Sequence, residues 1–374
     1  MRGRGVGALL LIAAIAVGCT GTPAPSRSSP HAPRGVPTPV VKPALVLTAD
    51  LSDRPARWQL VTKISVGRTI STLGMLPQSK EEPVPVFPTA FAVARDGSLW
   101  FLDVVHKRLA HFSMEGQFLS EIRGVHFDRY HPHPRDMAMS GSIPAVVDVG
   151  LDNEGIIEEP RPTGGFRATA VHDWRTPVYV SHLVQGVEGL VGSLDGTSFV
   201  NGLPPDFRHP RSFASMAVPG NGLARLVPGI PLQDGNWIDV RFAPLVTHRE
   251  GLGSTWFEAK FTGSQTASLL PIHFELKAPD GTRIPAAAGG ELDTALPHGV
   301  ACIIQMAPTR YRDAHLGNSR WFLELSDDGS PVIWERVPVP QIDDESVIRR
   351  LAVGPDHALY LMQVNAHEVS IYRR

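Results

Sequence analysis

Four segments of this chain open with the same pattern, and the spacing between them is regular. The segments are Phe87–Val93, His133–Met139, His209–Ser215 and Val347–Val353. The starts at Pro88 and Pro134 lie 46 residues apart, and those at Pro210 and Ile348 lie 138 apart, which is three times 46. Periods of this size are typical of repeat architectures, in which each unit buries its faces against the next.

The first and last copies align without gaps. Phe91–Phe112 matches Leu351–Tyr372 at a constant offset of 260, and the Asp96-Gly97 turn becomes Asp356-His357. We therefore expect His357 to adopt a positive φ, which His tolerates better than most residues. Each copy has an apolar run, a two-residue turn and a second run that is apolar at nearly every position. Such runs predict strands that are covered on both faces.

A second hairpin follows the first in residues 111–119, and residues 324–329 contain a related one, with an acidic residue and Gly at both turns. Two hairpins make a four-stranded unit, so residues 87–122 read as one complete unit. This unit resembles a blade of the NHL-repeat type of β-propeller, on the evidence of Pro88, Phe91-Ala92-Val93, Asp96-Gly97, Leu99-Trp100-Phe101, Asp103, Arg108-Leu109, Phe112 and Gly116-Gln117-Phe118. The resemblance is weaker over 348–374 and faint between 136 and 300.

The resemblance implies an all-β fold, a β-propeller whose blades surround a central axis. Unit starts near 88, 134, 210, about 256, about 302 and 348 predict six blades, with Trp256-Phe257 and Cys302-Ile303-Ile304 at the two unmarked starts. Seven blades follow instead if another unit lies near Pro177–Val180. The last unit has three evident strands. We expect Trp58–Ile64 to supply its fourth, so that the N-terminal strand closes the ring.

The N-terminus carries the pattern of a secretory signal. Arg2 and Arg4 precede an uncharged apolar stretch, Val6–Val17, that is too short for a permanent membrane span. The small residues before Cys19 resemble the lipobox of bacterial lipoproteins, which implies lipidation of Cys19 and attachment to a lipid bilayer. The alternative is an ordinary cleaved signal with an incidental Cys. The expected location is extracytoplasmic, lipid-anchored to the cell membrane or the outer membrane.

This pattern predicts three parts: a lipoprotein signal peptide over 1–18, a linker over 19–45, and a single propeller domain over 46–374. Residues 21–42 are rich in Pro, Ser and Thr. Such a segment stays disordered and extended, and at about 3 Å per residue it would hold the domain up to roughly 60 Å from the membrane.

Composition limits the classes of partner. The net charge is −2 and no sustained basic run occurs, so nucleic acid is not expected as a partner. The sequence predicts no cofactor. Cys302 is flanked by apolar residues on both sides, which favours a buried strand residue over a nucleophile.

Arginines recur at equivalent positions of three repeat openings: Arg135, Arg211 and Arg349. His133 and His209 lie beside two of them. Together these residues predict a positive collar that binds a carboxylate, sulfate or phosphate by bidentate hydrogen bonds. The alternative is that each arginine shapes its own turn and its guanidinium stays solvated.

Catalytic motifs are weak throughout. His126–His133 contains imidazole and carboxylate groups that suit a metal, but neither an HExxH motif nor a Gly-x-Ser-x-Gly elbow accompanies it. Glu158-Glu159 and Asp343-Asp344 lie beside Pro, so we expect solvated loops there. The function expected is therefore a module that binds or scaffolds an envelope protein, a glycan or an anionic small ligand. The alternatives are a metal-assisted hydrolase or lyase centred on residues 126–135, and an assembly factor.

Overall fold

The computed structural model describes residues 40–80, 84–123, 136–149, 155–161 and 166–170, strand segments between 172 and 262, and 267–374 apart from 285, 309–310 and 338–345. Residues 1–36 and 37–374 are separate units, and the described residues belong to the second. They form an all-β structure in which the one helical element described is a 3₁₀ helix, Tyr311–Leu316. The predicted signal peptide and Cys19 lie outside the described residues.

The first repeat unit forms the sheet that was predicted for residues 87–122. Its four strands pair antiparallel in chain order: β4 (Phe91–Val93), β5 (Leu99–Asp103), β6 (Arg108–Phe112) and β7 (Phe118–Ile122). Every residue of β4 and β5 is buried, which confirms that these strands are covered on both faces. The turn at Gly116 has φ of 83°, and a Cβ there would lie 2.6 Å from Thr62 Oγ1, so this close approach requires glycine.

The last repeat unit also matches its prediction. Its sheet has the order β28 (Leu351–Val353), β29 (Leu359–Val364), β30 (Glu368–Arg373) and β3 (Gln59–Ser65), all antiparallel. The fourth strand thus comes from the N-terminal side of the chain; Lys63 of β3 and Glu368 of β30, which form an ion pair, are 305 residues apart in sequence. His357 has φ of 61°, as the alignment with Gly97 predicted.

Two further four-stranded sheets follow the same antiparallel order in the chain. One contains β8 (Asp136–Ser140), β9 (Ile143–Val149), β10 (Gly155–Pro160) and β11 (Phe166–Ala170). The other contains β24 (Ala286–Leu296), β25 (Gly299–Pro308), β26 (Ser319–Ser326) and β27 (Pro331–Val337).

The middle of the chain forms less regular sheets. β14 (His182–Gly186), β15 (Gly189–Leu194) and β16 (Leu223–Pro228) make one sheet, in which β16 pairs parallel to β15. A larger sheet joins β17 (Ile230–Pro231), β18 (Trp237–Phe242), β21 (Trp256–Thr262) and β22 (Ala267–Lys277) to β1 (Val40–Val41), β2 (Leu45–Asp50) and β23 (Arg283–Ile284). Two short pairs, β12 (His172–Asp173) with β13 (Thr176–Pro177) and β19 (Thr247–His248) with β20 (Gly251–Leu252), complete the described strands.

Three sequence predictions need correction. Trp256 opens β21, and Cys302 lies in β25; both are interior strands, so neither residue starts a unit. Interior strands and first strands are both buried on two faces, and their apolar runs therefore look alike. Glu158 lies in β10 with no exposed surface, although a solvated loop was predicted. The expectation that Cys302 is a buried strand residue is confirmed, because Cys302 is 3% exposed.

Adjacent sheets pack face to face, and single strands contribute to two cores. In β25, Val300, Cys302 and Ile304 belong to a cluster shared with β2 and β22, whereas Ala301 and Ile303 face a second cluster shared with β28 and β29. This division follows from the two-residue period of a strand. Both faces of β25 are consequently removed from water.

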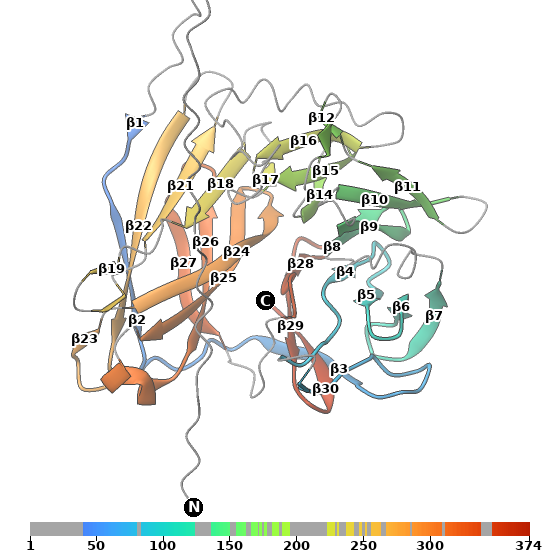
Figure 1. Cartoon of the computed structure of the whole chain (residues 1–374), viewed down its shortest axis with the longest axis horizontal. Coiled ribbons are helices and arrows are strands. Elements are labelled where there is room, and N and C mark those ends of the chain that lie inside the picture. Colours follow the sequence, from blue (N-terminus) through green and yellow to red (C-terminus); the bar gives the residue numbers. More distant parts are fainter. Residues whose placement is uncertain are drawn as a thin grey trace, which may run out of the picture. The chain divides into compact units, whose positions relative to one another are not determined.

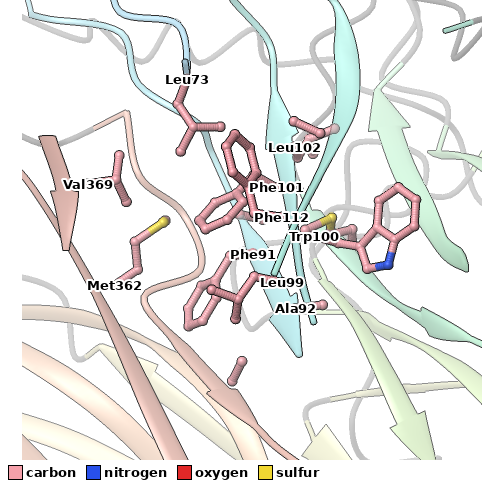
Figure 2. Packing of buried hydrophobic residues seen from close by; sticks show 14 of the residues in the cluster. Leu73, Phe91, Ala92, Leu99, Trp100, Phe101, Leu102, Phe112, Met362 and Val369 are labelled. Atoms are coloured by element: carbon pink, nitrogen blue, oxygen red, sulfur yellow. The ribbon is translucent and has the colours of Figure 1, made fainter. Parts of the chain in front are cut away.

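The β4–β7 sheet is enclosed in the same way. Figure 2 shows Met362 and Val369 of the last sheet on one side of Phe91 and Phe112, while Trp100 points to the opposite side. The same buried cluster extends to β8, β9 and β11. Strands β28, β4 and β8 contact one another in that order (Figure 1).

Residues 45–65, which we call the N-terminal belt, connect three sheets. β2 pairs parallel to β22, Ala56 N donates to Arg336 O at 2.7 Å beside β27, and β3 pairs with β30. Lys277 Nζ also lies 2.7 Å from Asp50 Oδ2, and this hydrogen bond is the main reason that the pKa of Asp50 falls to about 2. Within the described residues, the first paired strand is Val40–Val41, inside the segment that was predicted to be a linker.

A buried arginine, Arg108, joins the segment between β3 and β4 to the β4–β7 sheet. Arg108 on β6 is 1% exposed, and its Nε donates to Asp103 Oδ2 at 3.0 Å. Its Nη1 donates to Glu121 Oε2 at 2.8 Å and to Ile70 O at 2.7 Å, in the segment between β3 and β4. Gly74 N of the same segment donates to Asp103 Oδ1 at 3.1 Å. Each of these charges is therefore compensated by a hydrogen-bonded partner.

We expect Arg108→Met to lower the free energy of unfolding by about 3–5 kcal/mol, because the change leaves the buried Asp103 carboxylate without its guanidinium. Arg123→Met is the matched control, since Arg123 also pairs with Glu121 but its side chain is 63% exposed; little change is expected there. Urea unfolding followed by tryptophan fluorescence measures both. Equal losses of stability in the two variants would contradict the conclusion that Arg108 compensates the buried Asp103 carboxylate.

Candidate functional site

The starts of three first strands meet at one buried ion pair. Arg349, just before β28, directs its guanidinium at Asp136, the first residue of β8. Nε lies 2.6 Å from Oδ1 and Nη2 lies 2.5 Å from Oδ2, so the contact is bidentate. The side chains are 7% and 0% exposed. The two residues are 213 positions apart in sequence.

The backbone before β28 is fixed against the start of β4. Thr89 O accepts hydrogen bonds from Ile348 N at 2.8 Å and from Arg349 N at 3.0 Å. Ser346 Oγ accepts one from Phe87 N at 3.1 Å. The backbone of Arg349 is thus hydrogen-bonded to the residues before β4, and its side chain reaches the start of β8. Arg349 therefore links three sheets at their first strands.

This geometry defines what Arg349 can do. The carboxylate of Asp136 occupies one side of the planar fork with two parallel hydrogen bonds, which is the arrangement that an anionic ligand would use. A ligand would have to displace Asp136 from a site with almost no solvent exposure. Arg349 therefore holds the first strands together in this structure.

The other predicted collar residues cannot be placed with it. Arg135, Arg211, His133 and His209 lie outside the described residues, and the collar remains a prediction for them. Arg135 directly precedes Asp136, so its backbone joins the segment that Arg349 holds. The region 126–135, where a metal-assisted reaction was considered, lies outside the described residues as well.

Asp136 was missed at the sequence level, although a signal existed. The residues at its position in the four repeat openings are Ala90, Asp136, Ser212 and Arg350, and Asp136 is the acidic one among them. An acid beside three recurring arginines is a candidate partner for one of them. The sequence does not tell which arginine it meets, because the choice depends on how the sheets are placed.

A Ser–His–Asp cluster also lies in the first sheet. Ser98 Oγ is 2.6 Å from Asp96 Oδ1 and 2.7 Å from His111 Nε2, and His111 Nδ1 is 3.2 Å from Ser120 Oγ. Asp96 can only accept, so the Ser98 hydroxyl proton points to it and His111 Nε2–H donates to Ser98. A serine nucleophile needs the opposite direction, with the histidine accepting the proton.

The surroundings of His111 indicate a structural role. Its ring stacks on Trp100, with centroids 4.1 Å apart and the planes within 3° of parallel. Burial lowers the pKa of His111, and the charge of Asp96 opposes this shift. Asp96 also accepts a hydrogen bond from Ser98 N at 3.0 Å, which closes the turn between β4 and β5.

In the described part of the chain, no group of three or more His, Cys, Asp or Glu side chains is arranged so that it could hold a metal ion. No helix in this part has the length and apolar character needed to cross a bilayer.

Comparison with known proteins gives one family model and several solved structures. Residues 56–127 match the model of a domain of unknown function (DUF7485). The matched segment runs from just before β3 through β7, so it contains the strand that completes the last sheet and the whole first sheet. None of the curated proteins compared with the sequence matches it.

Three solved structures illustrate what the chain is similar to. Virginiamycin B lyase from Staphylococcus aureus is 11% identical, with 80% of this chain and 83% of that chain covered and a TM-score of 0.33. Aldose sugar dehydrogenase from Streptomyces coelicolor, in its PQQ-bound form, is 12% identical, with 77% and 94% covered and a TM-score of 0.38. The RRP9 WD40 repeats are 11% identical, with 80% and 97% covered and a TM-score of 0.38. At these scores, the fold assignment rests on the strand pairing within the chain itself.

The buried pair can be tested by a double-mutant cycle. We expect Arg349→Met and Asp136→Ala each to lower the free energy of unfolding by about 3–5 kcal/mol, because each leaves an uncompensated buried charge. The double variant should lose far less than the two single losses added together, because it removes both charges. Denaturant titration of the four proteins measures this. Additive losses would mean that the two side chains do not interact.

The exposed pair of Arg373 with Asp356 provides a control. Their side chains are 46% and 40% exposed, and surface pairs contribute about 0–1 kcal/mol. Arg373→Met should therefore change the stability much less than Arg349→Met does.

Proposed function

We propose that this protein is a lipid-anchored, extracytoplasmic β-propeller with six blades that serves as a binding or scaffold module at the cell envelope. The observation that carries the proposal is the repetition of four-stranded antiparallel sheets whose first strands meet, with β3 completing the last sheet. A rigid ring of this kind presents loops around an axis and is a common platform for ligands and partner proteins.

The contacts between first strands support the blade count and the closure. β4 contacts β8, β8 contacts β14, β14 contacts β17, β17 contacts β24, β24 contacts β28, and β28 contacts β4. This order returns to its starting point after six strands, each of which begins one of the sheets described above. Pairing of β3 with β30 places strands from both ends of the domain in one sheet and covers the edge of β30.

The N-terminal sequence supports the anchor and the location. Arg2 and Arg4, the apolar stretch Val6–Val17 and the small residues before Cys19 fit a lipoprotein signal. The Pro-rich segment after Cys19 would act as a spacer. A single acyl chain binds a bilayer only weakly, so stable attachment through Cys19 requires more than one chain or a second membrane contact.

The ligand that we propose is anionic, a glycan, cell-wall component or small molecule, held by Arg135 and Arg211 with His133 and His209. Support comes from the recurrence of the arginines in the repeat openings, and Arg135 and Arg349 each lie just before a first strand, β8 and β28, whereas Arg211 lies between β15 and β16 in the sequence. The ion pair of Arg349 with Asp136 fixes the backbone next to Arg135, so an arginine there would start from a rigid base.

The anchor predicts a clear result for Cys19→Ala. Cells that express the natural chain and are fed an alkyne-bearing fatty acid should label the protein, and the protein should sediment with membranes. The variant should show no label and should leave the membrane fraction, because the thiol that carries the lipid is gone. Cys302→Ala is the matched control and should keep both properties. A Cys19→Ala protein that is still labelled would refute the lipidation site.

The anionic ligand is tested with the double variant Arg135→Ala/Arg211→Ala. A panel of sulfated and uronic acid oligosaccharides, with inorganic sulfate as the simplest probe, is titrated into the purified domain by calorimetry. We expect a bound member of the panel to lose at least about tenfold in affinity, or roughly 1.4 kcal/mol, in the double variant. Arg123→Ala is the control, because Arg123 lies outside the repeat openings and its side chain is 63% exposed. Unchanged binding in the double variant would exclude the collar.

A further inference from the structure

The guanidinium of Arg374 lies in a corner formed by two aromatic rings. Its Cζ is 5.5 Å from the centroid of the Phe322 ring and 6.0 Å from that of the Trp58 ring. The two rings meet edge to face, with centroids 5.5 Å apart and an interplanar angle of 79°. A cation in this position is attracted by the faces of both rings.

Two carboxylates complete the surroundings of this guanidinium. Arg374 Nη1 forms an ion pair with Glu335 Oε1, which also accepts a hydrogen bond from Trp58 Nε1 at 3.2 Å. Glu324 is the second acid: burial raises the pKa of Glu324, and the positive charge of Arg374 counteracts the shift. Two aromatic faces and two acids around one cation are the elements of an aromatic cage.

The walls of the cage are built without Arg374. Phe322 and Glu324 are two residues apart on β26 and therefore point to the same face of the sheet. Glu335 lies directly opposite Phe322 on β27. Trp58 is held just before β3 by the belt, where Ala56 N donates to Arg336 O. The cage should thus persist when the Arg374 side chain is removed.

Exposure separates this site from the two buried arginine sites, those of Arg108 and Arg349. The Arg374 side chain is 35% exposed and that of Glu335 is 22% exposed, whereas Phe322 is completely buried and Trp58 is 8% exposed. The rings form a dry base, and the cation lies at an opening to solvent. Arg108 and Arg349, in contrast, are 1% and 6% exposed. The guanidinium of Arg374 can therefore leave and another can enter.

We propose that Trp58, Phe322, Glu324 and Glu335 form a binding site for the guanidinium of an arginine side chain, and that Arg374 of the same chain occupies the site as an intramolecular competitor. A tethered competitor is present at a high effective concentration, so it masks the site against weak external ligands. The ligand is a partner's arginine that displaces Arg374, and release of Arg374 exposes the cage to it.

The test compares Arg374→Ala with the neighbouring control Arg373→Ala. The probe is N-acetyl-arginine amide, which carries only the guanidinium charge, and its neutral isostere N-acetyl-citrulline amide is the control probe. We expect the Arg374→Ala protein to bind the arginine probe with a Kd of about 1 mM, and at least about tenfold more tightly than the natural chain or the Arg373→Ala protein does. The citrulline probe should not bind. Chemical shifts of the Trp58 indole N–H, assigned with Trp58→Phe, report the binding.

Two more variants make the result decisive. Arg374→Gln keeps two of the three methylenes of the apolar stem and removes the charge, so it reports on the site if Arg374→Ala does not fold. Adding Glu335→Gln to either variant should abolish the gain in binding, because the ion-pairing acid is lost. No binding by the folded Arg374→Ala or Arg374→Gln protein, or equal binding by the natural chain, would overturn the proposal and leave Arg374 as a structural contact.

Discussion

Inner strands of the regular sheets, such as β5 and β25, are buried on both faces, and this constraint governs the rest of the structure. A four-stranded sheet with apolar residues at nearly every position has no face to give to water, so it is stable only between neighbours. β25 illustrates the point, since Cys302 and Ile303 belong to different cores. Stability is therefore a property of the set of sheets, and the belt that joins three of them is part of the fold.

Buried polar side chains also hold the packed sheets together. Arg108 connects the β4–β7 sheet to the segment after β3, and Arg349 connects the starts of β28, β4 and β8. Both guanidiniums donate to acids or backbone carbonyls, as burial of a charge demands. Arg374 differs because its surroundings are aromatic on one side and open on the other. The same side chain type thus acts as a fixed connection at two places and as an exchangeable occupant at a third.

Much of the fold could be predicted where the information is local. Apolar runs, turn residues and a repeat predicted the hairpins of residues 91–122 and 351–372 and the strand β3. The repeat also predicted the positive φ of His357. Prediction failed for Trp256 because an apolar run does not show whether its strand is first or interior in a sheet. It failed for Glu158 because burial depends on packing against other parts of the fold. For the site, recurring arginines were visible, but the role of Arg349 was not, because its partner Asp136 is 213 residues away.

The sequence by itself determined which segments become strands, where the turns lie and which arginines recur, because these features depend on neighbouring residues and on a period that can be counted. Only the tertiary structure decided which charges meet: Arg349 with Asp136, and Arg374 with Glu335 between Trp58 and Phe322. Those meetings depend on how whole sheets pack against each other. Packing direction and distance are set by the sum of many apolar contacts, which no single motif encodes.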